Sequence, residues 1–100
     1  MIRDDWAPLR TMGTFTRRGA TGTLIETYHD GYEVNETGSF IWSLVGGGGT
    51  VCEIAGRLAT RYELAPEYAA EVVRGFLAEL CARGFIATDP DRDVGLVDSA

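Results

Sequence analysis

The fold is decided by a change of periodicity within the stretch Tyr32-Glu33-Val34-Asn35-Glu36-Thr37-Gly38-Ser39-Phe40-Ile41. Up to Val34 apolar and polar residues alternate, as in a half-buried strand, and after Glu36 the apolar residues recur at helical spacing. Asn35 can accept a hydrogen bond from the first helical turn, and a carboxylate at position 36 suits the positive end of a helix. The sequence therefore predicts that a strand passes directly into a helix at residue 35.

Three short strands are expected before and up to this junction, over residues 12–18, 23–28 and 32–34. Aromatic and β-branched residues cluster there between turn signals. The pair Asp30-Gly31 is typical of a two-residue type I′ turn, in which both central residues have positive φ. This turn predicts an antiparallel hairpin with Thr27 opposite Val34. The core face of the sheet would then contain Ile25, Thr27, Tyr32 and Val34.

Three helices are expected after the junction. The first ends at the glycine run 46–49, and Thr50 with Glu53 forms a capping box that begins the second. The third is expected over residues 66–83, with a proline in its first turn and Gly84 just beyond its end. Strands followed by helices indicate an α+β fold, with a three-stranded antiparallel sheet followed by three helices.

The length of 100 residues corresponds to a single domain, residues 1–100. Residues 1–11 show no periodicity and are expected to form a loosely ordered arm, from which Trp6 and Leu9 contact the body. Residues 88–100 contain four aspartates and are expected to form a loosely ordered tail.

The charge balance excludes two classes of partner. The net charge is −6, with fifteen carboxylates against nine arginines and no lysine. Nucleic acids and anionic membranes are bound mainly by basic side chains, so neither is expected as a partner. The first residues show no signal-peptide pattern and no stretch is long enough to span a bilayer, which favours a cytoplasmic protein. Cys52 and Cys81 are expected to be buried, reduced thiols on helix stripes.

The sequence contains no set of residues typical of an active site. His29 is the only histidine and lies beside a turn, without a nucleophile that it could activate. The glycine run before Thr50 lacks the lysine of a phosphate-binding loop. The two cysteines lack metal-ligand spacing. We therefore expect a protein that is not an enzyme and has no catalytic residues, metal or cofactor.

Two features instead indicate a binding surface. The apolar stripe of the third helix covers about half of its circumference, whereas one packed face needs roughly a third. This breadth fits packing against both the sheet and another helix, or one edge of the stripe lining an apolar groove. The third strand is short and lies at the edge of the predicted sheet, where an extended peptide could add as a further strand. The alternative is an edge protected by its shortness and by Glu33.

A set of residues with specific order and spacing extends from Tyr32 to Ile86. It comprises Val34-Asn35-Glu36-Thr37-Gly38, Ile41-Trp42, Leu44, Thr50-Val51, Glu53-Ile54, Leu58, Tyr62, Pro66-Glu67, Phe76-Leu77, Glu79-Leu80 and Arg83-Gly84-Phe85-Ile86. In these residues the chain resembles the PqqD-like family, the peptide chaperones or recognition elements of ribosomally made, modified peptides. The resemblance covers a little over half of the chain and implies a winged-helix-like fold.

The resemblance also implies a binding site. The leader of a precursor peptide would add as a strand beside Tyr32, Glu33 and Val34, in a groove whose helix wall comes from Val73, Phe76, Leu77 and Leu80. Asn35, Gly38 and Trp42 match the motif as fold-forming residues. Two departures from the family pattern are Ala65, where a polar cap is usual, and the four-glycine run, which replaces an Asp-Gly turn.

The resemblance implies that a separate enzyme modifies or cleaves the bound peptide. That enzyme would be a leader protease with a ring-closing synthetase, as in lasso-peptide systems, or a radical enzyme with an iron–sulfur cluster; the lasso type is favoured. The alternative function is a winged-helix DNA-binding regulator. Against the DNA-binding alternative, the arginines at positions 57, 61, 74 and 83 of the second and third helices are balanced by five glutamates. These helices therefore offer no basic surface that could read DNA.

Overall fold

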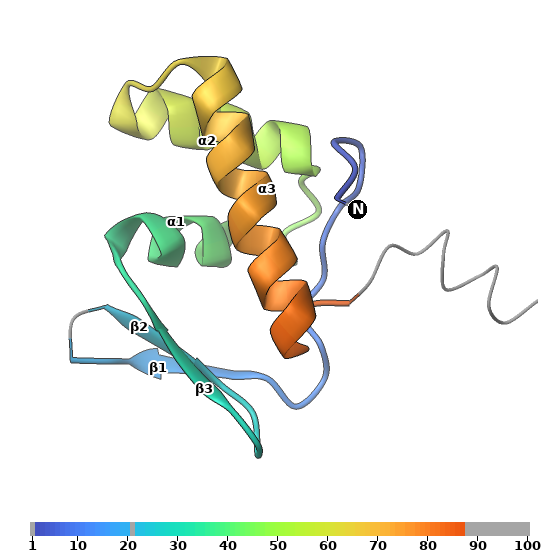
Figure 1. Cartoon of the computed structure of the whole chain (residues 1–100), viewed down its shortest axis with the longest axis vertical. Coiled ribbons are helices and arrows are strands. Elements are labelled where there is room, and N and C mark those ends of the chain that lie inside the picture. The colour runs from blue at the N-terminus through green and yellow to red at the C-terminus, as the bar shows by residue number, and fades with distance from the viewer. Residues whose placement is uncertain (1, 21, 88–100) are drawn as a thin grey trace, which may run out of the picture.

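The computed structural model describes residues 2–20 and 22–87. Its elements are β1 (Phe15–Arg18), β2 (Thr23–Glu26), β3 (Gly31–Val34), α1 (Glu36–Leu44), α2 (Val51–Tyr62) and α3 (Pro66–Arg83). The strands form one antiparallel sheet in the order β1-β2-β3. In Figure 1, α1 lies between the sheet and α2, and α3 crosses from α2 down to the sheet. The predicted α+β arrangement of three strands followed by three helices is confirmed.

The first two helices begin at the predicted caps. Asn35 Oδ1 accepts a hydrogen bond from the Gly38 N–H at 2.9 Å. Thr50 Oγ1 accepts from the Glu53 N–H at 3.2 Å, and the Glu53 carboxylate accepts from the Thr50 N–H at 2.8 Å, which completes the capping box. These bonds satisfy backbone N–H groups that have no partner inside the helix, so both starts are determined locally.

The ends of α3 also follow the sequence. Pro66 is the first helical residue, and Ala65 before it makes no side-chain cap. Gly84 ends the helix with φ of +84°, and its N–H bonds to the carbonyls of Cys81 and Leu80. A residue with a side chain is strained at such a positive φ, which explains glycine at this position.

The predicted register of the β2–β3 hairpin is wrong. Val34 lies opposite Thr23 instead of Thr27, a shift of four residues. The chain reverses over Tyr28 and His29, and the Thr27 N–H bonds to the Asp30 carbonyl at 2.8 Å. Gly31 has no positive φ, so a type I′ turn at Asp30-Gly31 is excluded.

In the observed turn the Asp30 side chain makes two contacts. Its carboxylate accepts from the Gly31 N–H at 2.8 Å and lies 3.4 Å from the Arg83 guanidinium at the end of α3. The register shift is an even number of residues, and side chains alternate between faces with a period of two. Ile25, Tyr32 and Val34 therefore still share the face that packs on the helices, as predicted.

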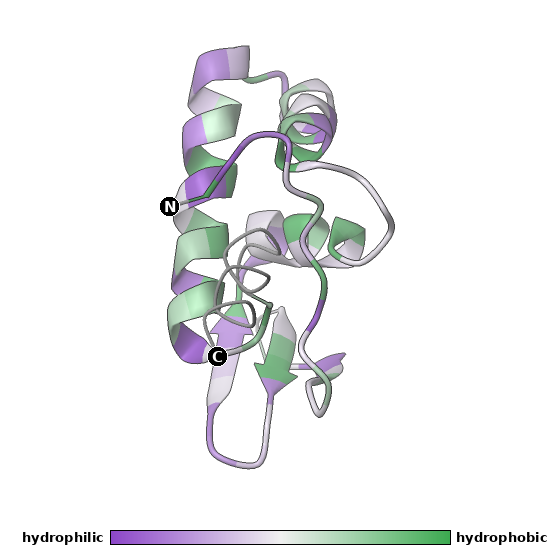
Figure 2. Ribbon diagram, turned by 90° about the vertical axis from the view of Figure 1, so that its right-hand side faces the viewer, coloured by the Kyte–Doolittle hydropathy of each residue, from purple (hydrophilic) through white to green (hydrophobic). Residues whose placement is uncertain are grey.

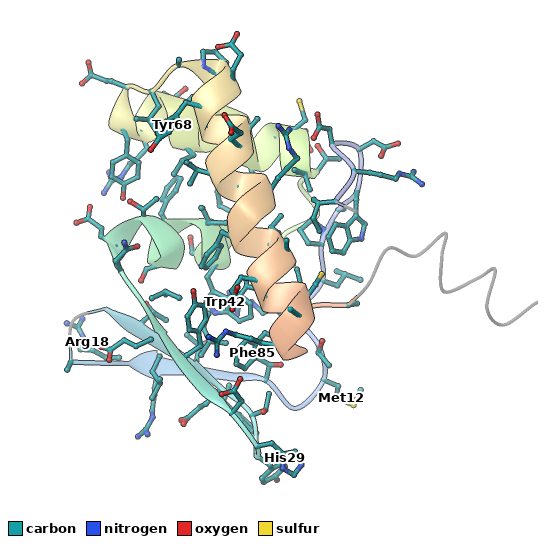
Figure 3. The ribbon with its side chains drawn as sticks, in the orientation of Figure 1. Met12, Arg18, His29, Trp42, Tyr68 and Phe85 are labelled. Carbon is teal, nitrogen blue, oxygen red and sulfur yellow. The ribbon has the colours of Figure 1, made fainter. Side chains whose placement is uncertain are left out.

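The core lies between this face of the sheet and the three helices. Trp42 of α1 is buried, its Nε1–H donates to Thr16 Oγ1 on β1 at 2.8 Å, and the Arg10 guanidinium lies 4.2 Å from its ring centroid. Figure 3 shows Trp42 and Phe85 between the sheet and the helices. The buried side chains are Trp6, Ile25, Val34, Ile41, Trp42, Val45, Val51, Ile54, Ala55, Leu58, Ala69, Val73, Leu77, Leu80, Phe85 and Ile86.

The N-terminal arm is an extended segment that bonds to parts of the chain distant in sequence. Arg10 forms a β-bridge with Ile86, and the Trp6 carbonyl accepts from the Val51 N–H at 2.8 Å. Trp6 is buried as expected, whereas Leu9 is half exposed. Figure 2 shows the arm running past the helices toward the sheet. Bonding of this kind leaves no helical or strand periodicity in the sequence. The expected tail, residues 88–100, lies outside the described residues.

The cysteines differ from the expectation of two buried thiols. Cys52 is exposed and Cys81 is partly buried. Cys52 is the second residue of α2, where its side chain lies outside the apolar stripe formed by Val51, Ile54 and Leu58. Burial raises the pKa of the Cys81 thiol. Among the described helices, none is long and apolar enough to cross a membrane.

Candidate functional site

A groove of about 490 Å³ lies where β3, the start of α1 and the middle of α3 meet. Val34 and Ile41, both almost fully buried, form part of its lining together with Gly38. Val72 and Phe76, which are one helical turn apart on α3 and half buried, also line it. The remaining lining residues are Tyr32, Glu33, Asn35 and Thr37. Apolar side chains from three elements thus converge on one open depression.

Gly38 allows these three elements to approach one another. A Cβ atom at this position would lie 2.9 Å from Val34 Cβ and 3.1 Å from Phe76 Cε1. Carbon atoms in contact normally lie about 3.5–4.0 Å apart, so a side chain here would push α1 away from β3 or displace the Phe76 ring. The glycine in the strand-to-helix junction therefore shapes the groove as well as the helix start.

β3 is an edge strand, since only β2 pairs with it among the described strands. The bond from the Thr27 N–H to the Asp30 carbonyl marks a hydrogen-bonded pair. Such pairs alternate along an antiparallel ladder, so Tyr32 and Val34 bond to β2. The N–H and C=O groups of Gly31 and Glu33 point away from β2. The outer edge of β3 therefore presents backbone donors and acceptors beside the groove.

The end of β3 nearest Gly31 is bordered by a cluster at the end of α3. The Tyr32 ring stacks on Phe85 with centroids 6.4 Å apart, and the Arg83 guanidinium lies 4.1 Å from the Tyr32 ring centroid. Arg83 Nε donates to the Glu79 carboxylate at 2.8 Å, and this hydrogen bond raises the pKa of Arg83. Arg83 thus holds a positive charge against Tyr32, one of the lining residues of a groove that combines apolar and polar side chains.

The structure separates the predicted site residues into two groups. Tyr32, Glu33, Val34 and Phe76 line the groove. Val73, Leu77 and Leu80 are completely buried in the core and do not line it. They occupy the centre of the stripe on α3, where they contribute to packing. In particular, Leu77, which the resemblance placed in the helix wall of the groove, belongs to the core.

Val72, Thr37 and Ile41 line the groove but were not predicted, and Asn35 and Gly38 line it although they were expected only to form the fold. Val72 could have been identified, because it lies four residues before Phe76 and therefore on the same side of the helix. No sequence signal distinguishes Ile41 from the other apolar residues of α1. Its role follows from the close approach that Gly38 permits.

The site offers binding groups and little reactive chemistry. The ionisable groups among the lining residues named above are the Glu33 carboxylate and the Tyr32 phenol. Within residues 2–20 and 22–87, no three His, Cys, Asp or Glu side chains are arranged to hold a metal ion. His29 is exposed in the hairpin turn, at the lower tip of the sheet in Figure 3.

Within the part of the chain that the structure describes, the arginines do not form a basic face for nucleic acid. Arg74 pairs with Asp4 at 3.1 Å, and Arg17 pairs with Glu26 at 2.7 Å. Arg83 pairs with Glu79, and the Arg61 guanidinium lies over Phe40. A positive surface that follows a phosphate backbone requires clustered cations, which this pairing with carboxylates and rings does not provide.

Three solved structures are similar to this chain. The PqqD truncation of Methylobacterium extorquens PqqCD, described as a functional and stand-alone RiPP recognition element, has a TM-score of 0.76 at 18% identity and covers 88% of this chain and 96% of its own. A lasso peptide synthetase B1 complexed with its leader peptide has a TM-score of 0.75 at 14% identity, covering 82% and 99%. TbiB1 in complex with the TbiA(β) leader peptide has a TM-score of 0.72 at 18% identity, covering 81% and 99%.

These structural similarities confirm the fold that the resemblance implied. No curated protein matches the sequence significantly. The family model of coenzyme PQQ synthesis protein D (PqqD) matches residues 23–86, which is more than half of the chain and includes β2, β3 and all three helices. The chain therefore belongs to the PqqD family.

Proposed function

We propose that this protein is a non-catalytic recognition element, which binds the leader segment of a ribosomally made precursor peptide and presents it to a separate enzyme. The observation that carries the proposal is the open edge of β3 beside a groove whose α3 wall is apolar. Two of the similar structures are complexes with leader peptides, which supports the same use of this fold.

Binding would occur by addition of a strand to β3. The outward N–H and C=O groups of Glu33 would bond to the peptide backbone, which provides affinity without dependence on sequence. Side chains on one face of the added strand would point toward Val72 and Phe76 of α3. Since side chains alternate along a strand, every second leader residue would enter the groove. Apolar side chains fit the part of its lining formed by Val72 and Phe76 best.

The partner enzyme would act on the peptide while this protein holds the leader. The similarity to a lasso peptide synthetase B1 favours a system of the lasso type, with a leader protease and a ring-closing synthetase. A radical enzyme is the alternative partner. In either case the bond-making or bond-breaking step belongs to that enzyme, because the groove residues include no pair of nucleophile and base.

Titration with a labelled leader tests the site. The probe is a fluorescein-labelled synthetic peptide that covers the leader of a short precursor, which is to be sought among the genes that neighbour the gene of this protein. Truncating a buried anchor of an interface costs about 2 kcal/mol or more, which is roughly thirtyfold in Kd. We expect such a loss for Phe76→Ala and a smaller one for Val72→Ala. Tyr68→Ala is the matched control, since Tyr68 is an exposed aromatic residue near the start of α3 and does not line the groove.

Substitutions on the edge separate backbone pairing from side-chain contacts. Glu33→Pro removes an outward N–H and should abolish binding, whereas Glu33→Ala retains the backbone and should bind nearly as wild type. The N–H of Val34 bonds to β2, so proline at that position would damage the sheet itself. If both Glu33 variants and Phe76→Ala remain folded and bind like wild type, the proposed site is wrong.

Mass spectrometry tests the non-catalytic role. The leader should keep its mass after prolonged incubation with the pure protein, with and without nucleotide. Cleavage or modification of the peptide under these conditions contradicts the proposal.

A further inference from the structure

The outward N–H of Gly31 is already occupied in this structure. Asp30 Oδ1 accepts a hydrogen bond from it at 2.8 Å. Gly31 pairs with Glu26 at a position of the ladder without cross-strand bonds, so its N–H points toward the open edge of β3. A peptide strand that paired along the whole of β3 would place a backbone carbonyl where this carboxylate oxygen lies.

The carboxylate is held there from the α3 side. Asp30 Oδ2 lies 3.4 Å from Arg83 Nη1, and Arg83 is itself positioned by Glu79 and by the Tyr32 ring. Both ion pairs of Arg83 are partly exposed and contribute little to stability by themselves. Their effect here is geometric, because they orient one oxygen of Asp30 toward α3 and leave the other for the Gly31 N–H.

We infer that Asp30 is a specificity-determining residue, which terminates pairing of the bound peptide at Glu33. This inference rests on the proposed function and names the register of the peptide. A hydrogen bond to a carboxylate is stronger than one to a neutral carbonyl, so a peptide carbonyl does not readily displace Asp30 from Gly31. The site therefore accepts strands whose paired segment ends beside Glu33, and a strand that continues past Gly31 gains no affinity from the additional residues.

The same arrangement protects the edge when no peptide is bound. Charged groups at sheet edges are a common means of preventing unspecific strand pairing. Asp30 blocks the Gly31 end of β3, which lies beside the exposed hairpin turn, whereas the Glu33 end lies beside the groove. Strand addition is thereby restricted to the part of β3 where α3 can also contact the side chains.

Hydrogen exchange in the full-length protein tests the contact directly. In the absence of peptide, the Gly31 amide should exchange at least about fivefold more slowly in wild type than in Asp30→Ala, measured by NMR on uniformly labelled protein. Asp30→Asn is the conservative variant, because it retains an acceptor oxygen but not the charge, and it should be intermediate. Glu79→Ala removes a partner that positions Arg83 but keeps Asp30, so it should raise the Gly31 exchange rate less than Asp30→Ala does.

Leader truncation tests the functional consequence. The labelled leader used above is shortened one residue at a time from each end, and Kd is measured for wild type and Asp30→Ala. In wild type, the residues that would run past Gly31 should be dispensable. For Asp30→Ala, the Kd of the full leader should be at least about fivefold lower than for wild type. Removing the leader residues that would run past Gly31 should cancel this gain in affinity.

The outcomes are distinct for the two proposals. Equal affinities and equal truncation profiles for wild type and Asp30→Ala overturn the role of Asp30 while leaving leader binding intact. Unchanged Gly31 exchange in folded Asp30→Ala overturns it as well. Failure of the leader to bind any folded variant, wild type included, overturns the proposed function together with the inference.

Discussion

Two isosteric substitutions near the start of the sheet should differ in their effect on stability, because only one of them removes a hydrogen bond. The Thr16 hydroxyl accepts the indole N–H of Trp42 at 2.8 Å, and Trp42 is only 1% exposed. The Thr14 hydroxyl oxygen is buried and has no hydrogen-bond partner within the described residues. Thr→Val replaces a hydroxyl by a methyl group of nearly the same size, so each variant changes hydrogen bonding with little change in shape.

The expected magnitudes follow from the cost of an unsatisfied buried group. Thr16→Val removes the acceptor of a buried donor, which costs about 1–3 kcal/mol. For a domain of this size, each kcal/mol lowers Tm by roughly 4–8 °C. Thr14→Val removes an oxygen that already lacks a partner, so it should be neutral or raise stability by up to about 1 kcal/mol. Valine is favourable in strands, hence a loss at Thr16 cannot result from strand propensity.

Urea and thermal unfolding followed by circular dichroism measure both variants against wild type. The double variant should show the sum of the two effects, provided that the two hydroxyls act independently. If Thr16→Val melts at or above the wild-type temperature, the bond to Trp42 does not contribute as we infer. A large loss in Thr14→Val would show that its hydroxyl has a partner after all.

Three further predictions concern α3 and the cysteines. Leu77→Ala should lower the free energy of unfolding by about 2–5 kcal/mol because Leu77 is completely buried, while the folded variant keeps its leader affinity; weaker binding at unchanged stability would instead place Leu77 in the groove. Gly84→Ala should cost about 1–2 kcal/mol in urea unfolding, because φ at this position is +84°, and an unchanged midpoint would contradict this. A thiol reagent should label the exposed Cys52 before Cys81. Because burial raises the pKa of Cys81, less of its thiolate is present at a given pH, so the labelling rate of Cys81 should still rise at pH values where that of an ordinary thiol has levelled off. Equal labelling rates and equal pH profiles for the two cysteines would refute this.

Much of the site could be predicted because its parts are local or periodic. The cap at Asn35 and the capping box at Thr50 depend on side chains within three residues of the bonds they make. The edge position of β3 follows from its place as the last strand before a helix. The core face of the sheet was also predicted correctly although the predicted register was wrong, since the face on which a residue lies depends only on the alternation of side chains along each strand.

The remaining features were decided by tertiary structure. In the turn of the β2–β3 hairpin, the Asp30 carboxylate contacts Arg83, which lies 53 residues away in the sequence, and such a contact leaves no local pattern. Likewise, the apolar stripe of α3 does not reveal which of its edges meets the core. That depends on how the helix crosses the sheet and α2, which buries Val73, Leu77 and Leu80 and leaves Val72 and Phe76 at the groove. The sequence alone thus determined the elements, their caps and the family resemblance, whereas the register and the groove wall required packing between distant segments.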